Sequence, residues 1–320
     1  MIPAMFIAEI EKRLRIATGK ADCYISDFFD LIAGTSTGGI LACYYLYHHN
    51  GKRFDAAKAI DLYEKYGTTV FRKRFFSFFL RLFDSLYPDK GIDSVLKETF
   101  GEAKLSEAPC NSAVLAYDIT ARKAVIFTGD TARKEKKRDY LLRDIARATS
   151  AAPTYFRVAK AVSMDSAPSY LIDGGIYAND PTICAMIEAR KTPLHHQNVY
   201  PKIKDMFILS LGTGQTAKAY PYEKAKHWGV IKWAIPMIDM LQSSSAEVVS
   251  YQVQSLFETE GCSDRYIRIM PELHNVTHRM DDASRRNIAC IKESGARCIA
   301  SNSALIDKIV NNLINKVYEI

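Results

Sequence analysis

The chain has 320 residues, of which 48% are hydrophobic and 25% are charged, so it has ample material for a globular core. Its net charge of +7 is a mild excess that is compatible with anionic lipid headgroups or with nucleic acid and establishes neither, and we predict no nucleic-acid partner. No apolar run approaches the roughly 18 residues of a membrane-spanning helix, which argues against an integral membrane protein.

Helices and strands alternate in the first third of the chain. Apolar residues recur at helical spacing from Ile2 to Leu14 and Gly19 follows them, which predicts an amphipathic helix that ends at the glycine. A buried strand over 28–33, a glycine-rich turn and a second helix over 37–48 come next. Residues 52–108 are predicted to be mainly helical.

The same alternation continues to the C-terminal end. The strand-like runs 112–120 and 124–129 predict a hairpin, and a helix is expected over 140–149. Short strands are predicted over 170–173, 206–211 and 265–269, and the tail from Asp281 is expected to be helical with a break near Asn302. No repeat or linker divides the chain, so we predict one domain over 1–320 with an α/β layered sheet.

The turn after the first strand has the pattern of a serine nucleophile. Gly34-Thr35-Ser36-Thr37-Gly38 matches G-x-S-x-G, in which glycines on both sides of the serine let the strand and the following helix approach each other. The helix N-terminus offers the N–H of Thr37 to a developing anion. An ordinary tight turn remains the alternative, whereas a P-loop is disfavoured because the Gly-Lys-Ser/Thr ending is absent.

Asp173 is the strongest candidate for the base that a serine nucleophile requires. It ends a predicted strand and precedes Gly174-Gly175, and a carboxylate in such a place could accept the proton of Ser36 if burial raises its pKa. A turn-forming Asp-Gly-Gly without chemistry is the alternative. No histidine stands at a strand end beside a small-residue turn, and we interpret all of them as surface or capping residues: His48 and His49 at a helix end, His195, His196, His227, His274 and His278.

Four motifs in this order resemble the patatin-like phospholipase family. They are Gly34-Thr35-Ser36-Thr37-Gly38-Gly39, the run Ala148 to Phe156, Asp173-Gly174-Gly175 with Asn179-Asp180-Pro181, and Ser210-Leu211-Gly212-Thr213-Gly214. The resemblance spans nearly the whole chain. It implies a three-layer α/β/α fold with a mostly parallel central sheet and hydrolysis of acyl esters in phospholipids and related lipids. We predict no metal or cofactor, because the cysteines and histidines of the sequence do not cluster. By motif match, Ser36 is the nucleophile and Asp173 the general base, while Asp180 departs from the second asparagine common in the family.

The family pattern normally opens with a strand and a glycine-rich loop that supplies oxyanion N–H groups. This sequence starts at Met1, inside what resembles the next helix, so we expect the first strand and the loop to be missing from an N-terminally shortened domain. Losing one oxyanion donor typically costs about 100- to 1,000-fold in turnover. Two functions therefore stay open: a hydrolase of phospholipase A or lysophospholipase type that works through an acyl-enzyme, and a catalytically impaired lipid-binding or regulatory module.

A basic aromatic stretch, Phe71–Phe83, is the candidate for membrane contact. Its aromatic residues are spaced for one helical face and its basic residues lie mostly on others, as in a helix that lies in a headgroup layer. A cover helix whose aromatics belong to the core is the alternative. Dispersed cysteines without a CxxC pair and the absence of a recognisable leader predict a cytoplasmic protein, peripheral at a membrane if this stretch binds lipid.

Overall fold

A computed structural model describes residues 1–71, 85–165, 167–193, 199–214, 220–277, 279 and 281–318. The first half contains α1 (Ile2–Thr18), β1 (Leu31–Thr35), α2 (Thr37–Tyr45), β2 (His48–His49), β3 (Lys52–Arg53), α3 (Ala59–Val70), α4 (Asp89–Phe100), β4 (Asn111–Asp118), β5 (Lys123–Phe127), α5 (Gly129–Lys134), α6 (Leu142–Thr149) and β6 (Ala159–Ala161). The second half contains β7 (Ser169–Asp173), α7 (Thr182–Lys191), β8 (Ile208–Leu211), α8 (Tyr222–Ala225), α9 (Val230–Thr259), β9 (Tyr266–Ile269), α10 (Arg285–Ser301) and α11 (Ser303–Tyr318).

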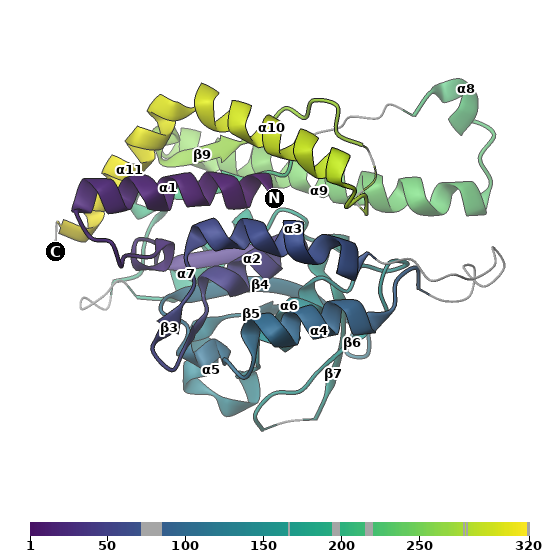
Figure 1. The fold of residues 1–320 in the computed structure, drawn as a ribbon, viewed down its shortest axis with the longest axis horizontal. Helices are drawn as coiled ribbons and strands as arrows, with labels where there is room; N and C mark the ends of the chain where they lie inside the picture. Colours follow the sequence, from purple (N-terminus) through teal and green to yellow (C-terminus); the bar gives the residue numbers. More distant parts are fainter. Residues whose placement is uncertain are drawn as a thin grey trace.

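The central sheet is covered by helices on both faces, which confirms the predicted three-layer α/β fold (Figure 1). Successive residues of a strand point to opposite faces. Val114 and Ala116 of β4 accordingly join the main core, where α2 and α6 pack together, whereas Ala113 and Leu115 form a second core with Ala178 next to α7.

Strand β4 organises this sheet. It pairs parallel with β1 and antiparallel with β5 and β7, and β6 completes the sheet on β7. The predicted hairpin is confirmed as β4–β5. Short connections require antiparallel pairing in β4–β5 and β6–β7, so β1, β4 and β6 run in one direction and β5 and β7 in the other. Strands β8 and β9 form a separate parallel pair.

The N-terminal helix and the C-terminal helices pack together beside the main sheet (Figure 1). Helix α1 buries one apolar face and ends at Gly19, whose φ of 68° is the left-handed conformation common after a helix end. The tail breaks at Asn302 between α10 and α11. Both features agree with the sequence-based expectation.

One predicted element is wrong. Helix α2 ends at Tyr45, and His48 and His49 form a short antiparallel hairpin with β3 instead of a helix end. The turn residues Asn50 and Gly51 have φ of 52° and 72°, and positive φ at both central residues is what a tight hairpin turn requires. The Asn-Gly dipeptide outweighed the helical pattern.

The predicted membrane stretch Phe71–Phe83 lies outside the described residues except for Phe71, and His195, His196 and His278 also lie outside them. Residues 133–138 form a basic run that is exposed throughout, and it lies on the end of α5 and the turn that follows it. Within the described ranges, no helix is long and apolar enough to cross a membrane.

Candidate active site

Ser36 occupies a strained turn between β1 and α2. It is the residue that precedes the first turn of α2, and its φ of 57° with ψ of −128° lies outside the regions that ordinary side chains favour. Backbone strain of this kind costs energy and persists where the surrounding structure holds it, often at functional sites. The strand-to-helix context that the G-x-S-x-G pattern predicts is therefore present around Ser36.

Two glycines allow the close packing of this turn. The first is Gly34, as predicted, but the second is Gly39 and not Gly38. A Cβ on Gly34 would lie 2.1 Å from the carbonyl oxygen of Gly38, so this position accepts only glycine. A Cβ on Gly38 would meet nothing within 4 Å. The second close approach occurs at Gly39, where a Cβ would lie 2.5 Å from Cγ2 of Thr149. Gly39 therefore takes the packing role that the pattern suggested for Gly38.

Thr149 holds the turn; it lies in the run Ala148 to Phe156, but no role was predicted for it. Its fully buried hydroxyl accepts the N–H of Ser36 at 3.0 Å and donates to the carbonyl of Leu115 at 2.6 Å. A second bond, from Thr35 Oγ1 to the carbonyl of Ala178 at 2.8 Å, fixes the end of β1. Since the N–H of Ser36 is already occupied, the N–H of Thr37 is the nearest donor that α2 leaves without an intrahelical partner.

The sheet register brings Asp173 to Ser36. Strand β5 pairs with β4 over Val114–Asp118 and so occupies one edge of β4. Strands β1 and β7 each pair with some of the same β4 residues, so both must lie on the other edge of β4. Thr35 pairs with Leu115, and Asp173 pairs with the next residue, Ala116. The two strands therefore meet end to end, with Ser36 directly after one end and Asp173 at the other.

Asp173 is a buried carboxylate with an altered proton affinity. Its side chain is almost completely buried, and this burial raises the pKa from 3.8 to about 6, although the Ser36 hydroxyl and the Gly175 N–H each lower it in part. The Gly175 N–H donates to Oδ1 at 2.7 Å. Within the described part of the chain, the buried Oδ2 has no hydrogen-bond partner of ordinary geometry, which leaves it available to accept a proton.

Of the two glycines after Asp173, Gly174 is required by space and Gly175 lies in a tight position. A Cβ on Gly174 would lie 2.7 Å from backbone atoms of Leu115, and one on Gly175 would lie 3.1 Å from Oδ1 of Asp173. Both residues of the Gly174-Gly175 turn therefore support the position of the carboxylate, as the sequence suggested.

A buried ion pair connects this turn to the β8–β9 sheet. Arg268 of β9 lies 2.5 Å from Oδ2 of Asp180 and donates to Ser210 Oγ at 2.5 Å, and the N–H of Thr182 donates to Oδ1 of Asp180 at 2.9 Å. The negative charge that distinguishes Asp180 from the asparagine of the family pattern is thus neutralised by a partner on a different sheet. Arg268 was not predicted to take part in the site.

Ser36 and Asp173 open into a cleft of about 2380 Å³ that separates the two sheets. Strands β1 and β8 both line it, and within the described residues β1 pairs only with β4 and β8 only with β9. Apolar side chains cover much of its wall, including Leu41, Met186, Leu209 and Leu313. No histidine of the described part lines the cleft, and no group of three metal-ligating side chains occurs among the described residues.

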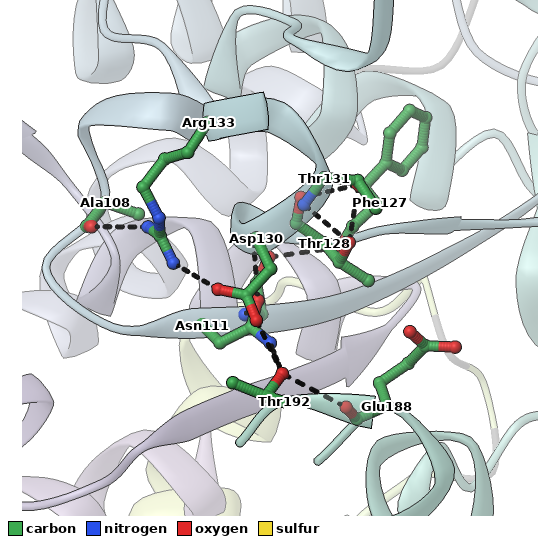
Figure 2. Close-up of polar contacts among 10 residues, drawn as sticks. Ala108, Asn111, Phe127, Thr128, Asp130, Thr131, Arg133, Glu188 and Thr192 are labelled. Atoms are coloured by element: carbon green, nitrogen blue, oxygen red, sulfur yellow. Dashed lines mark hydrogen bonds and ion pairs between the residues drawn. The ribbon is translucent and has the colours of Figure 1, made fainter. Parts of the chain in front are cut away.

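A second polar cluster lies at the start of β4, around Asn111 (Figure 2). Asp130 accepts from Arg133 at 2.7 Å and from the Thr192 hydroxyl at 2.5 Å, while its N–H donates to Asn111 at 3.0 Å. Burial raises the pKa of Asp130, but the hydrogen bonds from Thr192 and Arg133 outweigh it and hold the pKa below its usual value. This carboxylate joins β4, α5 and the end of α7, and it is stabilised in the charged form.

A strained serine at a strand-to-helix turn beside a buried carboxylate is typical of hydrolases that use a serine nucleophile. A family model of patatin-like phospholipases matches residues 5–186. Three relatives from Solanum tuberosum extend the similarity: Patatin-2-Kuras 3 (30% identical over 93% of this chain and 80% of the relative), Patatin-04/09 (31%, 92% and 79%) and Probable inactive patatin-3-Kuras 1 (30%, 100% and 86%). The chain belongs to the patatin-like phospholipase family, a family of lipid acyl hydrolases.

Proposed function

We propose that this chain hydrolyses acyl esters of phospholipids or lysophospholipids, with Ser36 as the nucleophile and Asp173 as the general base. The observation that carries the proposal is the end-to-end meeting of β1 and β7, which sets a strained serine beside a buried carboxylate whose pKa is about 6. A carboxylate with this pKa is largely ionised at neutral pH and is more basic than an exposed aspartate, so it can take a serine proton without a histidine.

In the acylation step, Oγ of Ser36 attacks the ester carbonyl carbon and its proton passes to Asp173. Oδ2 is the suitable acceptor because Oδ1 already accepts the Gly175 N–H. The tetrahedral intermediate carries its negative charge on the former carbonyl oxygen. It then collapses, the bond to the alcohol oxygen breaks, and Asp173 returns the proton to the departing alcohol, which leaves an acyl-enzyme on Ser36.

Deacylation repeats the same proton transfers with water as the nucleophile. Asp173 takes a proton from water, the resulting hydroxide oxygen attacks the acyl carbon, and Ser36 recovers its proton as the fatty acid departs. The N–H of Thr37 and the positive end of the α2 dipole stabilise the oxyanion in both steps. The apolar wall of the cleft supplies the environment for the acyl chain.

A catalytically impaired lipid-binding module is the second candidate. Two observations favour it: Thr37 is the single oxyanion donor that we assign, and one relative is named a probable inactive patatin. Because one missing donor typically costs about 100- to 1,000-fold, slow turnover is compatible with an otherwise intact site.

The test is hydrolysis of a medium-chain aryl ester by the full chain, beside Ser36→Ala and a matched control, Ser301→Ala, on the exposed surface of α10. We expect turnover that disappears in Ser36→Ala and persists in the control. Labelling by a fluorophosphonate, with loss of fluoride and a new bond to Oγ, should also depend on Ser36. Equal turnover in Ser36→Ala would refute the assigned nucleophile, and a folded chain without turnover or labelling would favour the impaired module.

A further inference from the structure

Within the described part of the chain, helix α9 carries apolar side chains that are exposed along one face. Val230, Met237, Leu241 and Val248 follow one another at intervals of seven, four and seven residues, so they share one side of the helix. Val230 is 89% exposed, and the other three are each exposed by half or more. The opposite side of α9 carries its buried residues, Val249, Val253 and Phe257. Apolar residues aligned in this way mark an interaction surface.

Aromatic and basic side chains gather at the start of this face. Trp228 forms edge contacts with Tyr220 at 5.4 Å and with Trp233 at 5.1 Å between ring centroids. Lys226 lies 5.5 Å from the ring of Tyr222, which is itself 75% exposed. We call residues 220–241 the α8–α9 arm, and Figure 1 shows α8 and the first half of α9 projecting beyond the other helices.

The charges of the arm favour an anionic surface. Three exposed lysines, Lys224, Lys226 and Lys232, stand against Glu223, which pairs with Lys226, and Asp239, which accepts the hydroxyl of Tyr220 at 2.8 Å, so the arm has a small positive excess. A second copy of a chain with a net charge of +7 would bring like charges together. Tryptophan and tyrosine beside lysine, next to an exposed apolar helical face, are the side chains that settle in a lipid headgroup layer.

The arm is continuous with the site. Asp239, Met240 and Ser243 of α9 line the cleft, and the carbonyl of Gln242 accepts Nδ2 of Asn179 at 3.3 Å, close to the turn that carries Asp173. A surface that docks on lipid here would hold the mouth of the cleft against the bilayer.

We propose that the α8–α9 arm, together with the exposed face of α9, docks the protein on the surface of a membrane that contains anionic phospholipid. This surface is distinct from the predicted stretch Phe71–Phe83. Binding is a property separate from turnover, so it is measured on the Ser36→Ala variant, which leaves the arm unchanged.

The chain offers a specific probe, because its two tryptophans, Trp228 and Trp233, both lie in the arm. Vesicles of phosphatidylcholine with about one quarter phosphatidylglycerol should shift tryptophan emission to the blue and sediment the protein, whereas phosphatidylcholine alone should bind it more weakly. Raising the salt concentration should weaken only the anionic component.

The deciding variant replaces the apolar anchors: Val230→Ser, Met237→Ser and Leu241→Ser combined. Since these residues are exposed, far-UV circular dichroism and the thermal transition should stay unchanged, and vesicle affinity should fall by about 10-fold or more. The matched control replaces three exposed apolar residues elsewhere, Ile16, Ile119 and Ile187, by serine and should bind as the parent does.

Three results would overturn the docking surface. The first is equal vesicle binding by the anchor variant and the parent chain, and the second is absence of binding by the parent chain. The third is a molecular mass that increases with concentration in the parent chain but not in the anchor variant, which would make the face a contact between copies. Failure of the proposed hydrolysis is recognised separately, because the soluble aryl ester needs no vesicle. A chain that binds vesicles but never turns over keeps the docking surface and loses only the catalytic assignment.

Discussion

Replacing Asp173 by asparagine should stabilise the protein at neutral and higher pH while abolishing hydrolysis. The carboxylate is ionised there but buried, and asparagine keeps its shape and its ability to accept the Gly175 N–H without the charge. A tenfold difference in proton affinity corresponds to about 1.4 kcal/mol, so the rise of the Asp173 pKa from 3.8 to about 6 corresponds to about 3 kcal/mol.

The sign follows from proton linkage. A carboxyl whose folded pKa is raised binds its proton more tightly in the folded state, so its contribution to stability is full below 3.8 and is lost as the pH rises through about 6. Asp173→Asn should therefore match the parent chain near pH 4 and exceed its free energy of unfolding by up to about 3 kcal/mol near pH 8. Activity of the parent should fall as the pH drops below about 6, because the base becomes protonated.

Urea unfolding of both proteins at the two pH values measures the difference, and aryl-ester hydrolysis measures the loss of turnover, about 100-fold or more for removal of a general base. Asp130→Asn is the matched control, because its carboxylate is held in the charged form by Thr192 and Arg133 and its replacement should destabilise the protein at pH 8 (Figure 2). A stability difference for Asp173→Asn that is zero at pH 8, or independent of pH, would refute the assignment of Asp173 as a desolvated base.

Three further substitutions test the supports of the site. Gly34→Ala places a Cβ 2.1 Å from a carbonyl oxygen, so the thermal transition should fall by an amount equivalent to about 3 kcal/mol or the soluble yield should be lost. Thr149→Val leaves the N–H of Ser36 without its acceptor, and we expect slower ester hydrolysis with about 1–3 kcal/mol lower stability in urea. Arg268→Met leaves Asp180 charged and unpaired at a cost of about 3–5 kcal/mol, which adding Asp180→Asn should largely restore.

Local patterns were sufficient to predict most elements. The apolar run before Gly34 and the glycine-rich turn predicted a strand, a sharp turn and a helix, and β1, the strained Ser36 and α2 occupy those places. Helix α1 with its stop at Gly19 depends only on side chains within one segment. The secondary structure of a segment can be predicted from the sequence where it depends on residues close along the chain.

Features that depend on a distant segment were missed. Gly39 is constrained by Thr149, which comes 110 positions later, so the motif alone suggested Gly38 instead. Arg268 reaches Asp180 from a different sheet, and an aspartate in that place gave no sign of its partner. Gly39 and Thr149 lie in two of the quoted motifs, but neither motif indicates that the two residues touch, and no motif connects Asp180 with Arg268.

The reason for expecting Asp173 near Ser36 was also incomplete. The sequence argument placed a carboxylate at the carboxyl end of a strand in a parallel sheet, but β7 runs antiparallel to β4. Its last residue nevertheless reaches the correct level, because β7 and β1 approach each other from opposite directions along one edge of β4. The residue was identified from its local setting, while the geometry that makes it useful comes from the pairing.

Because of that pairing, one position of β4 supports both Ser36 and Asp173. The carbonyl of Leu115 accepts the hydroxyl of Thr149 that holds Ser36, and the same residue packs against Gly174, next to Asp173. A slip of β7 by one residue would move Asp173 by about 3.3 Å and turn its side chain to the other face of the sheet. Only three residue pairs join β7 to β4, so the distance between Ser36 and Asp173, the proposed nucleophile and base, depends on a short register that Thr149 and the Gly174-Gly175 turn must hold.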